Sequence, residues 1–537
     1  MADAAHTIAE QDLGPREAYM RTAGTITRLL DEVLSEVLLQ CANGVREAYY
    51  QSWHHGASET PPNSFSWLPI THVCRHWRDV ALASPRLWSH VDVWKNDRTA
   101  TFIKRSGKVP LTIRHYKPSY TAEAIGLVFE HIARVRVLDL NCSSMPGQNP
   151  SLDQYKVPQD APLILEELCL SCVNVDYVRT LVRPQMTHLS ISTGLGSVAD
   201  WTEIVSGLPH LVELELVFVM QPNDDEVASM RPGARPVATN IIELPYLERL
   251  HLSGNDAGMG VAQLLGRLAF PSSARVLFDA HWLNIEPDIG ALLPAIFGAV
   301  AAGVQRSMDG PAREMRALRV YRRFGDTLVV EAWPTPRSAA ELHNNFTDRT
   351  PGRVELTLHT QQSPLEDILR AALAALPLAR VETLAVLGSE ALPWAHFAAL
   401  QDVTELAVAF TCPAVALASA FAVGPGDEAP LLFPALRTLS VAGAHWGRRV
   451  DAAGEEIPEG RALAERLQAA LWQRRELGVP VQKLCVPWGV ELQDGVAEEF
   501  RASGAVEEVE WSAGENPEYA KQRESLEGWW FGNPDSA

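Results

Sequence analysis

Residues 67–88 read WLPITHVCRHWRDVALASPRLW, and the apolar side chains among them recur with the period of a helix. Six of them fall at i, i+3, i+4, i+7, i+10 and i+11, namely Ile70, Val73, Cys74, Trp77, Val80 and Ala81. This spacing predicts one helix over residues 70–81 with a single apolar face. Ser84 before Pro85 is typical of an N-cap and the first residue of a second helix, on which Leu87 and Trp88 can pack against the first.

A second apolar stripe lies upstream and predicts another helix, with Asp31 and Glu32 at its N-terminus. Its members are Leu30, Val33, Leu34, Val37, Leu38 and Cys41. The polar segment 43–64 has no apolar period, so we expect a loop there. Two or three short helices bury little surface among themselves, and we therefore expect leftover apolar surface to meet something else.

Residues 28–42, RLLDEVLSEVLLQCA, and residues 67–93 together resemble an F-box of the form common in mushroom-type fungi. In that family a first helix, Leu-Pro-x-Glu-Val-Leu-x-x-Ile-Phe, is followed by Val-Cys-(Arg/Lys)-x-Trp-(Arg/Lys)-x-(Val/Ile)-Ala and Pro-x-Leu-Trp. Residues 73–81, VCRHWRDVA, and 85–88, PRLW, match the later parts closely. Leu30 stands where the family usually has Pro, and the segment 43–64 is an insertion relative to the family pattern.

The resemblance implies a substrate-recognition subunit of an SCF-type cullin–RING ubiquitin ligase. Its F-box would dock on the Skp adaptor, and through it on cullin, while the rest of the chain holds a target protein. The chain itself would not be an enzyme and would need no cofactor. The implied adaptor-binding residues are Leu29, Leu30, Val33, Leu34, Val37, Leu38, Ile70, Val73 and Trp77. Some of these must form the core of the F-box instead, with Trp77 and Trp88 the first expected inside, and the sequence alone does not sort them.

The composition is that of a globular chain, with 47% apolar and 21% charged residues. The net charge of −20 argues against a general nucleic-acid binder. Cys169 and Cys172 form a lone CxxC, for which a structural role is expected rather than a metal or redox site. The start of the chain lacks the pattern of a secretory signal, and the apolar runs 289–304 and 413–423 are short for membrane spans. We therefore expect a cytoplasmic or nuclear protein without membrane partners.

From about residue 100 a phrase recurs, apolar-x-x-Leu-x-apolar, with Leu in the middle of ten of eleven copies. The copies span 135–140, 165–170, 186–191, 211–216, 247–252, 315–320, 381–386, 403–408, 436–441, 481–486 and, degraded, 506–511. The steps from 165 to 186 to 211 are close to the period of leucine-rich repeats. One short strand per copy, with helices such as 261–268, 365–376 and 463–472 between them, predicts an irregular leucine-rich-repeat solenoid. A non-repetitive α/β domain is the alternative.

The expected fold class is therefore α/β, with a small helical F-box followed by the solenoid. The expected organisation is a leader over 1–26, an F-box-like domain over 27–95, a repeat domain over 100–515 and a tail or cap over 516–537 that carries Trp529, Trp530 and Phe531. Residues 102–113 resemble the strand that follows the F-box in the fungal proteins.

Charged side chains at alternate positions of the predicted strands should face outward and are the candidates for target binding. The chosen set is Arg249, His251, Arg319, Tyr321, Arg322 and Arg323, and its basic part could receive an acidic or phosphorylated peptide. Such charges are otherwise ordinary solvated groups. No P-loop, GxGxxG, GxSxG or HExxH motif occurs, so neither a small-molecule substrate nor a metal is expected. Two other functions stay open, a scaffold that works with the adaptor outside a ligase and a binding module whose N-terminal helices are only a cap.

Overall fold

A computed structural model describes most of the chain between residues 29 and 511. The described residues are 29–54, 64–93, 96–115, 121–140, 152–157, 162–194, 196–220, 240–255, 258–281, 289–308, 310, 313–323, 327–344, 352–359, 365–388, 392–409, 411–422, 431–442, 449–450, 456–457, 459–486 and 496–511. The expected leader, the expected tail and its aromatic residues lie outside them. The chain divides into two compact units, Met1–Met186 and Thr187–Ala537. The expected boundary between 95 and 100 does not coincide with this division.

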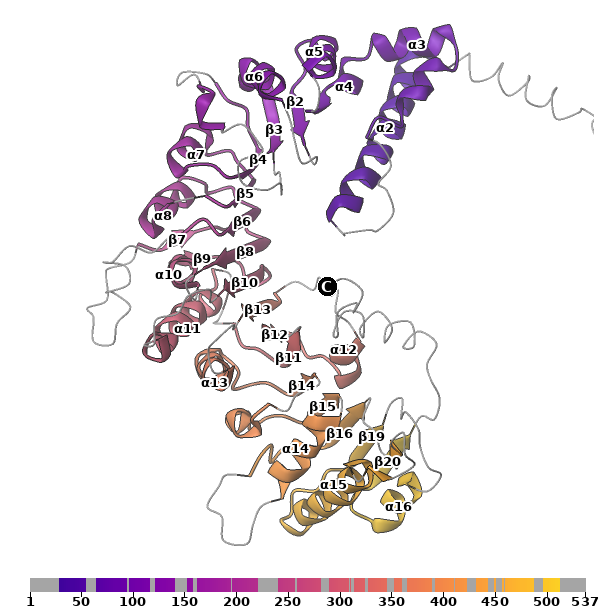
Figure 1. The fold of residues 1–537 in the computed structure, drawn as a ribbon, viewed down its shortest axis with the longest axis vertical. Coiled ribbons are helices and arrows are strands. Elements are labelled where there is room, and N and C mark those ends of the chain that lie inside the picture. Colours follow the sequence, from indigo (N-terminus) through magenta and orange to yellow (C-terminus); the bar gives the residue numbers. More distant parts are fainter. Residues whose placement is uncertain are drawn as a thin grey trace, which may run out of the picture. The chain divides into compact units, whose positions relative to one another are not determined.

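The first unit contains the F-box-like segment and the first strands (Figure 1). Its helices are α2 (Asp31–His54), η1 (Leu68–His72), α3 (Arg75–Leu82), α4 (Pro85–Trp88), α5 (Asn96–Arg105), α6 (Ala122–Glu130), η2 (Ile132–Arg134), η3 (Leu152–Gln154) and α7 (Val175–Leu181). Its strands are β1 (His90–Asp92), β2 (Leu111–Arg114), β3 (Val135–Leu140) and β4 (Glu167–Ser171), paired parallel in that order.

The helix α2 is longer than expected and includes residues 43–54, so the predicted loop is wrong there; residues 55–63 lie outside the description. The buried face continues beyond Leu38 through Ala42, Arg46 and Tyr49. The apolar pattern of the sequence did not predict this continuation, because a charged residue, Arg46, occupies a core position. Its guanidinium donates to the Leu87 carbonyl at 2.8 Å and lies 5.2 Å from the centre of the Trp67 ring.

The helix expected over 70–81 is interrupted at Cys74, which has extended backbone angles and caps α3 by accepting from the Trp77 amide. The single-helix prediction is therefore wrong, and a 3₁₀ turn precedes α3. The second helix begins at Pro85, as predicted. Trp88 folds back onto α3, where its indole donates to the Ala81 carbonyl at 2.8 Å.

Residues 102–113 form a strand only at their end. Phe102 lies on α5, where its ring packs edge-on against Trp88 at 5.1 Å and Phe65 at 5.7 Å. The strand prediction is thus wrong for 102–105 and right from Leu111. An aromatic core therefore joins α5 to α4 and to the turn that carries Phe65.

The second unit is a mixed α/β unit. Its strands are β5 (His188–Ser192), β6 (Glu213–Val217), β7 (Ile242–Glu243), β8 (Arg249–Gly254), β9 (Leu268–Ala269), β10 (Arg275–His281), β11 (Ala317–Arg323), β12 (Thr327–Trp333), β13 (Val354–His359), β14 (Thr383–Leu387), β15 (Glu405–Ala409), β16 (Thr438–Ala442), β17 (Arg449–Val450), β18 (Glu456–Ile457), β19 (Lys483–Val486) and β20 (Glu508–Trp511). Its helices are α8 (Val198–Ser206), α10 (Met259–Leu265), α11 (Ile289–Gln305), α12 (Ala339–Asn344), α13 (Leu365–Ala375), η5 (Trp394–Phe397), α14 (Thr411–Phe421), α15 (Glu459–Glu476) and α16 (Val496–Ser503).

The main sheet of this unit runs in the order β5-β6-β8-β10-β13-β12-β11-β14-β15-β16-β19-β20. The central leucines of the recurring phrase face each other in register, Leu189 with Leu214 and Leu214 with Leu250. The same ladder continues from Leu318 through Leu384, Leu406, Leu439 and Leu484 to Val509. All eleven predicted segments are strands in the two units, and the α/β class is confirmed.

The recurring phrase did not predict β10 and β13 of the main sheet, because Val276 and Val354 stand there in place of the central leucine. A larger departure is β12, which runs antiparallel to both β11 and β13 and interrupts the parallel order.

Three of the earlier strands end alike: Cys172, Thr193 and Phe218 each follow a strand directly and have a positive φ of 53–56°.

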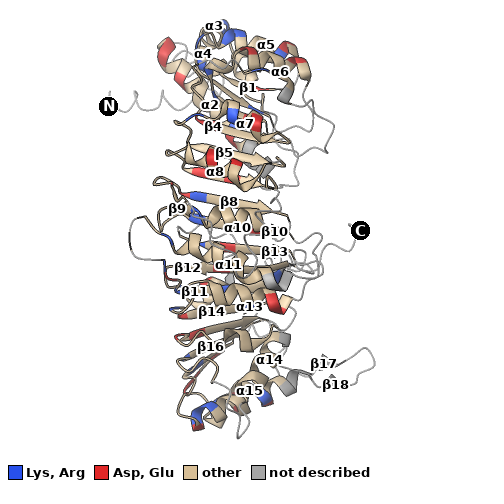
Figure 2. Cartoon of the chain, turned by 90° about the vertical axis from the view of Figure 1, so that its left-hand side faces the viewer, with Lys and Arg blue, Asp and Glu red and all other residues tan. Residues whose placement is uncertain are grey.

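Helices α10 and α11 carry no charged residue, as Figure 2 shows. Among the described residues, no helix combines the length and the apolar character that crossing a membrane requires. The runs 289–304 and 413–423 instead correspond to α11 and α14.

Candidate functional site

The two faces of α2 separate the predicted adaptor-binding residues. Leu34 and Leu38 are 0% and 1% exposed. Leu30, Val33 and Val37 are 69%, 46% and 41% exposed. We call the exposed three the α2 stripe; Leu30 directly precedes the helix, and the i, i+3 and i+7 spacing puts it in line with Val33 and Val37.

Leu34 and Leu38 are core residues of the first unit, so they cannot contact a partner while the unit is folded. Val73, by contrast, is 63% exposed, and Leu29, Ile70 and Trp77 are half-buried. The expectation that both tryptophans lie inside is right for Trp88 and wrong for Trp77.

Exposed apolar side chains concentrate in this region. The described part of the chain has eleven large apolar side chains that are exposed, and five of them lie between residues 30 and 82: Leu30, Val33, Val37, Val73 and Leu82. An ion pair between Glu36 and Arg86 at 3.3 Å and a contact between Asp31 and His76 at 3.7 Å link α2 to the neighbouring elements. These surface pairs add little stability, but they orient the helices that carry the apolar residues.

The second predicted site lies on the sheet of the second unit, where Arg249 and His251 project from β8. Arg249 lies 3.7 Å from Glu213, and His251 Nδ1 lies 2.7 Å from Glu215. Hydrogen bonding from His251 holds the pKa of Glu215 at about 2, although burial of the carboxyl opposes this. Each basic side chain therefore contacts a carboxylate on the adjacent strand, and this part of the face is not a basic patch.

Arg319 and Tyr321 are buried, so their assignment to target binding is wrong. The reason is a second hydrophobic core on this side of the sheet, formed by Ala317, Tyr321, Val329, Trp333, Ala339, Leu342, Ala385, Leu387, Ala407 and Ala409. The small alanines of β14 and β15 let α12 pack closely against the sheet (Figure 1). Arg322 is half-buried, and the side chain of Arg323 lies outside the description.

The charge of Arg319 is compensated inside this core. Glu331 accepts from both Arg319 and Arg353, and Arg319 also donates to the Leu342 carbonyl of α12 at 2.8 Å. Burial also raises the pKa of Tyr321, so its hydroxyl stays protonated and does not act as a charged surface group.

The C-terminal ends of β10 and β13 bring together Asp279, His281 and His359. The Nε2 atoms of His281 and His359 lie 3.3 and 3.1 Å from Oδ1 of Asp279. Burial raises the pKa of Asp279, but the two imidazoles lower it more and bring it to about 2. A cavity of about 560 Å³ opens over these residues and is also lined by His251, Thr327 and Glu355.

Sequence analysis missed this cluster and assigned no metal ligand. Asp279 and His281 are two residues apart on one strand, but His359 is distant in sequence and belongs to a strand without the recurring phrase. The alternation of Asp279 with His281 at a strand end was the available signal.

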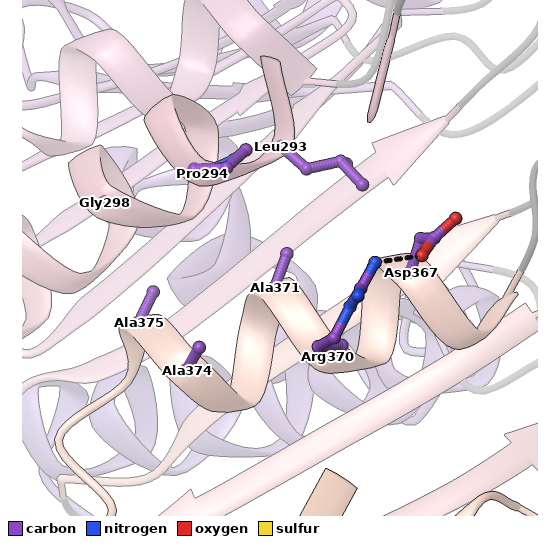
Figure 3. Close-up of a pocket in the computed structure, with 8 residues that line it drawn as sticks. All are labelled: Leu293, Pro294, Gly298, Asp367, Arg370, Ala371, Ala374 and Ala375. Atoms are coloured by element: carbon purple, nitrogen blue, oxygen red, sulfur yellow. Dashed lines mark hydrogen bonds and ion pairs between the residues drawn. The ribbon is translucent and has the colours of Figure 1, made fainter. Parts of the chain in front are cut away.

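A cavity of about 720 Å³ lies between α11 and α13 (Figure 3). Its lining is mainly small or apolar, from Leu293, Pro294, Gly298, Ala371, Ala374 and Ala375. The charged groups, Asp367 and Arg370, pair with each other along one helix turn. Ligand sites usually combine apolar walls with several converging polar groups. This cavity therefore has less to orient a ligand than the one over β10 and β13.

No family model matches this chain, and a search of the curated proteins gave no match either.

Proposed function

We propose that this protein is a substrate-recognition subunit of an SCF-type cullin–RING ubiquitin ligase, working in the cytoplasm or nucleus. Its F-box-like helices would dock on the Skp adaptor, and its strand–helix units, taken as irregular leucine-rich repeats, would hold the target protein. The chain would contribute proximity rather than bond chemistry, since holding a target lysine near a charged conjugating enzyme raises its effective concentration.

The observation that carries the proposal is the α2 stripe together with Val73. A segment that resembles an F-box leaves Val33 and Val37 of α2, and Leu30 just before it, in solvent, although Leu34 and Leu38 in the adjacent row of the helix are buried. Exposed apolar patches mark interaction surfaces when they are contiguous. The F-box resemblance implies the Skp adaptor as the occupant.

The repeat interpretation is supported by the in-register leucine ladders and by the recurrent positive φ after three strands. Steps of 21 and 25 residues separate Cys172, Thr193 and Phe218, the same steps as between the phrases that precede them. The antiparallel β12 is the irregular element that this interpretation must accommodate.

The test is a pull-down of the full chain with recombinant Skp adaptor, using Val33→Asp and Val37→Asp. Because both side chains are exposed, each variant should keep wild-type stability within about 0.5 kcal/mol. Each should bind the adaptor at least tenfold more weakly, which corresponds to about 1.4 kcal/mol. Leu477→Asp is the matched control, since Leu477 is 54% exposed far along the sequence and should not affect binding.

Wild-type adaptor binding by both stripe variants would contradict the docking assignment. Leu34→Asp serves a different purpose, because it places a charge in the core and should unfold the first unit. The alternative function, a scaffold that works with the adaptor outside a ligase, predicts adaptor without cullin in immunoprecipitates from cells.

A further inference from the structure

We propose that Asp279, His281 and His359 form a binding site for a divalent first-row transition metal ion, with zinc the best match. This inference is independent of the proposed ligase function and concerns only the sheet of the second unit. Two imidazoles and one carboxylate are a common three-residue ligand set for zinc when a fourth position is left open.

The geometry of the three groups fits the ion. Two ligand atoms of a tetrahedral zinc site lie about 3.3 Å apart when each is about 2.0–2.1 Å from the metal. The two distances from Asp279 Oδ1 to the imidazole Nε2 atoms, 3.3 and 3.1 Å, have this size. All three potential ligand atoms lie within 4.8 Å of one another.

Direct hydrogen bonding does not explain the arrangement. Among the described residues, the buried Oδ1 of Asp279 accepts no hydrogen bond, although two ring nitrogens are within 3.3 Å. The distances are short enough for hydrogen bonds, so each ring nitrogen either carries no proton or does not direct it at the oxygen. A buried carboxylate oxygen without a donor is costly, and a cation held between the three groups would satisfy it.

Neighbouring residues pack against the two rings. The rings of His281 and His359 stack with their centres 3.9 Å apart and their planes at 14°, so one ring must turn about its side-chain bonds before both Nε2 lone pairs point at one ion. Phe218 packs edge-on against His281 at 4.9 Å. Thr327 Oγ1 lies 3.1 Å from Nδ1 of His359. When Nδ1 carries the proton and donates to Thr327, Nε2 keeps its lone pair, which is the usual outer-shell arrangement of a metal-binding histidine.

Access and coordination number follow from the position of the site. The three residues are half-buried and border the cavity of about 560 Å³, so an ion can enter from solvent. With three protein ligands, at least one coordination position faces this cavity. Water or a side chain of a bound protein would complete the coordination there.

The experiment measures Zn²⁺ binding to the full chain by competition with a chromophoric chelator, and Co²⁺ binding by visible absorption. We expect Asp279→Asn and His359→Ala to lose one equivalent of bound metal relative to wild type. Thr327→Val should weaken that equivalent by about 10–100-fold, because it removes an outer-shell partner. His251→Ala is the control, since His251 lines the same cavity but is not one of the three ligands, and it should bind like wild type.

The Co²⁺ spectrum separates this site from cysteine sites elsewhere in the chain. Nitrogen and oxygen ligands give weak visible bands, whereas thiolate ligands add an intense charge-transfer band in the near ultraviolet. Equal stoichiometry and affinity in wild type, Asp279→Asn and His359→Ala would overturn the proposal, as would a titration in which every bound equivalent of Co²⁺ shows the thiolate band. If a ligand variant does not fold, the comparison of Thr327→Val with His251→Ala decides, and equal affinities there refute the site.

Discussion

The ion-pair network in the second unit allows a sharp test of the fold, by replacing Glu331 with Ala. Glu331 and Arg319 are 0% exposed and Arg353 is 3% exposed, and both guanidinium groups donate to the one carboxylate. Removing it leaves Arg319 with a positive charge inside a hydrophobic core, opposite the neutral Leu342 carbonyl. Arg353 keeps its contact with Glu355 at 2.8 Å, so Arg319 suffers the larger loss.

The expected magnitude follows from this burial. Removing one partner of a buried ion pair typically costs about 3–5 kcal/mol, because an uncompensated charge remains out of water. Glu331→Gln keeps the shape and one acceptor, so it should cost less, about 1–3 kcal/mol. Exchanging all three residues for apolar ones, with Arg319→Met, Glu331→Leu and Arg353→Met, should be close to neutral or stabilising.

The assay is urea denaturation combined with hydrogen–deuterium exchange of peptides from β11, β12 and α12, which localises the loss. Glu382→Ala is the control, because Glu382 pairs with Arg316 but both side chains are 39% exposed. A half-exposed pair is screened by water and should contribute only about 0–1 kcal/mol. If Glu331→Ala lowered the free energy of unfolding no more than Glu382→Ala does, the inference that α12 covers a buried network of charged side chains would be refuted.

Two further predictions concern stability. Gly303 and Gly298 share α11, but a Cβ on Gly303 would overlap the Leu265 carbonyl oxygen, whereas one on Gly298 would meet nothing within 4 Å. Gly303→Ala should therefore destabilise the protein by about 1–3 kcal/mol, and Gly298→Ala should stabilise it by about 0.5–1 kcal/mol, with thermal unfolding showing opposite shifts. Burial, and then the charges of Arg46, Arg114 and Arg136, lower the pKa of His90 from 6.5 to about 3. Between pH 6.5 and 3 the His90 imidazole binds a proton in the unfolded chain but not in the folded chain. The free energy of unfolding should therefore fall as the pH drops through this range, by at most about 1.4 kcal/mol per pH unit. His90→Gln should lack this contribution, and identical pH profiles would exclude His90 as its source.

Apolar periodicity was enough to predict much of the fold. A leucine flanked by apolar residues at fixed offsets predicted β3 and β14 equally well, because one face of every such strand must be buried. The start of α4 followed from Ser84 and Pro85, which act locally. Local signals of this kind need no knowledge of which element packs against which.

Features that depend on distant partners could not be predicted. Arg46 continues the buried face of α2 because distant partners receive its guanidinium, among them the Leu87 carbonyl, 41 residues away in the sequence. Arg319 was predicted on the surface because the strand pattern was assumed to have one solvated face. The alternate residues Ala385, Ala407 and Ala409 were the available sign that this face is covered.

If the second unit holds the proposed target protein, the change in the outward face along its sheet limits where that protein can bind. Over β5, β6, β8, β10 and β13 this face carries polar side chains such as Ser190, Glu215 and Asp279, whereas over β11, β14 and β15 it is apolar and packs against α12. The change falls at β12, whose Thr327 faces the His359 cavity while its Trp333 lies in the second core. A partner that binds through polar groups must therefore dock over strands β5, β6, β8, β10 and β13, where the three proposed metal ligands also lie. Acidic and basic groups already pair there, so such a partner must either replace existing partners, such as His251 on Glu215, or bind through hydrogen bonds and the metal rather than through net charge.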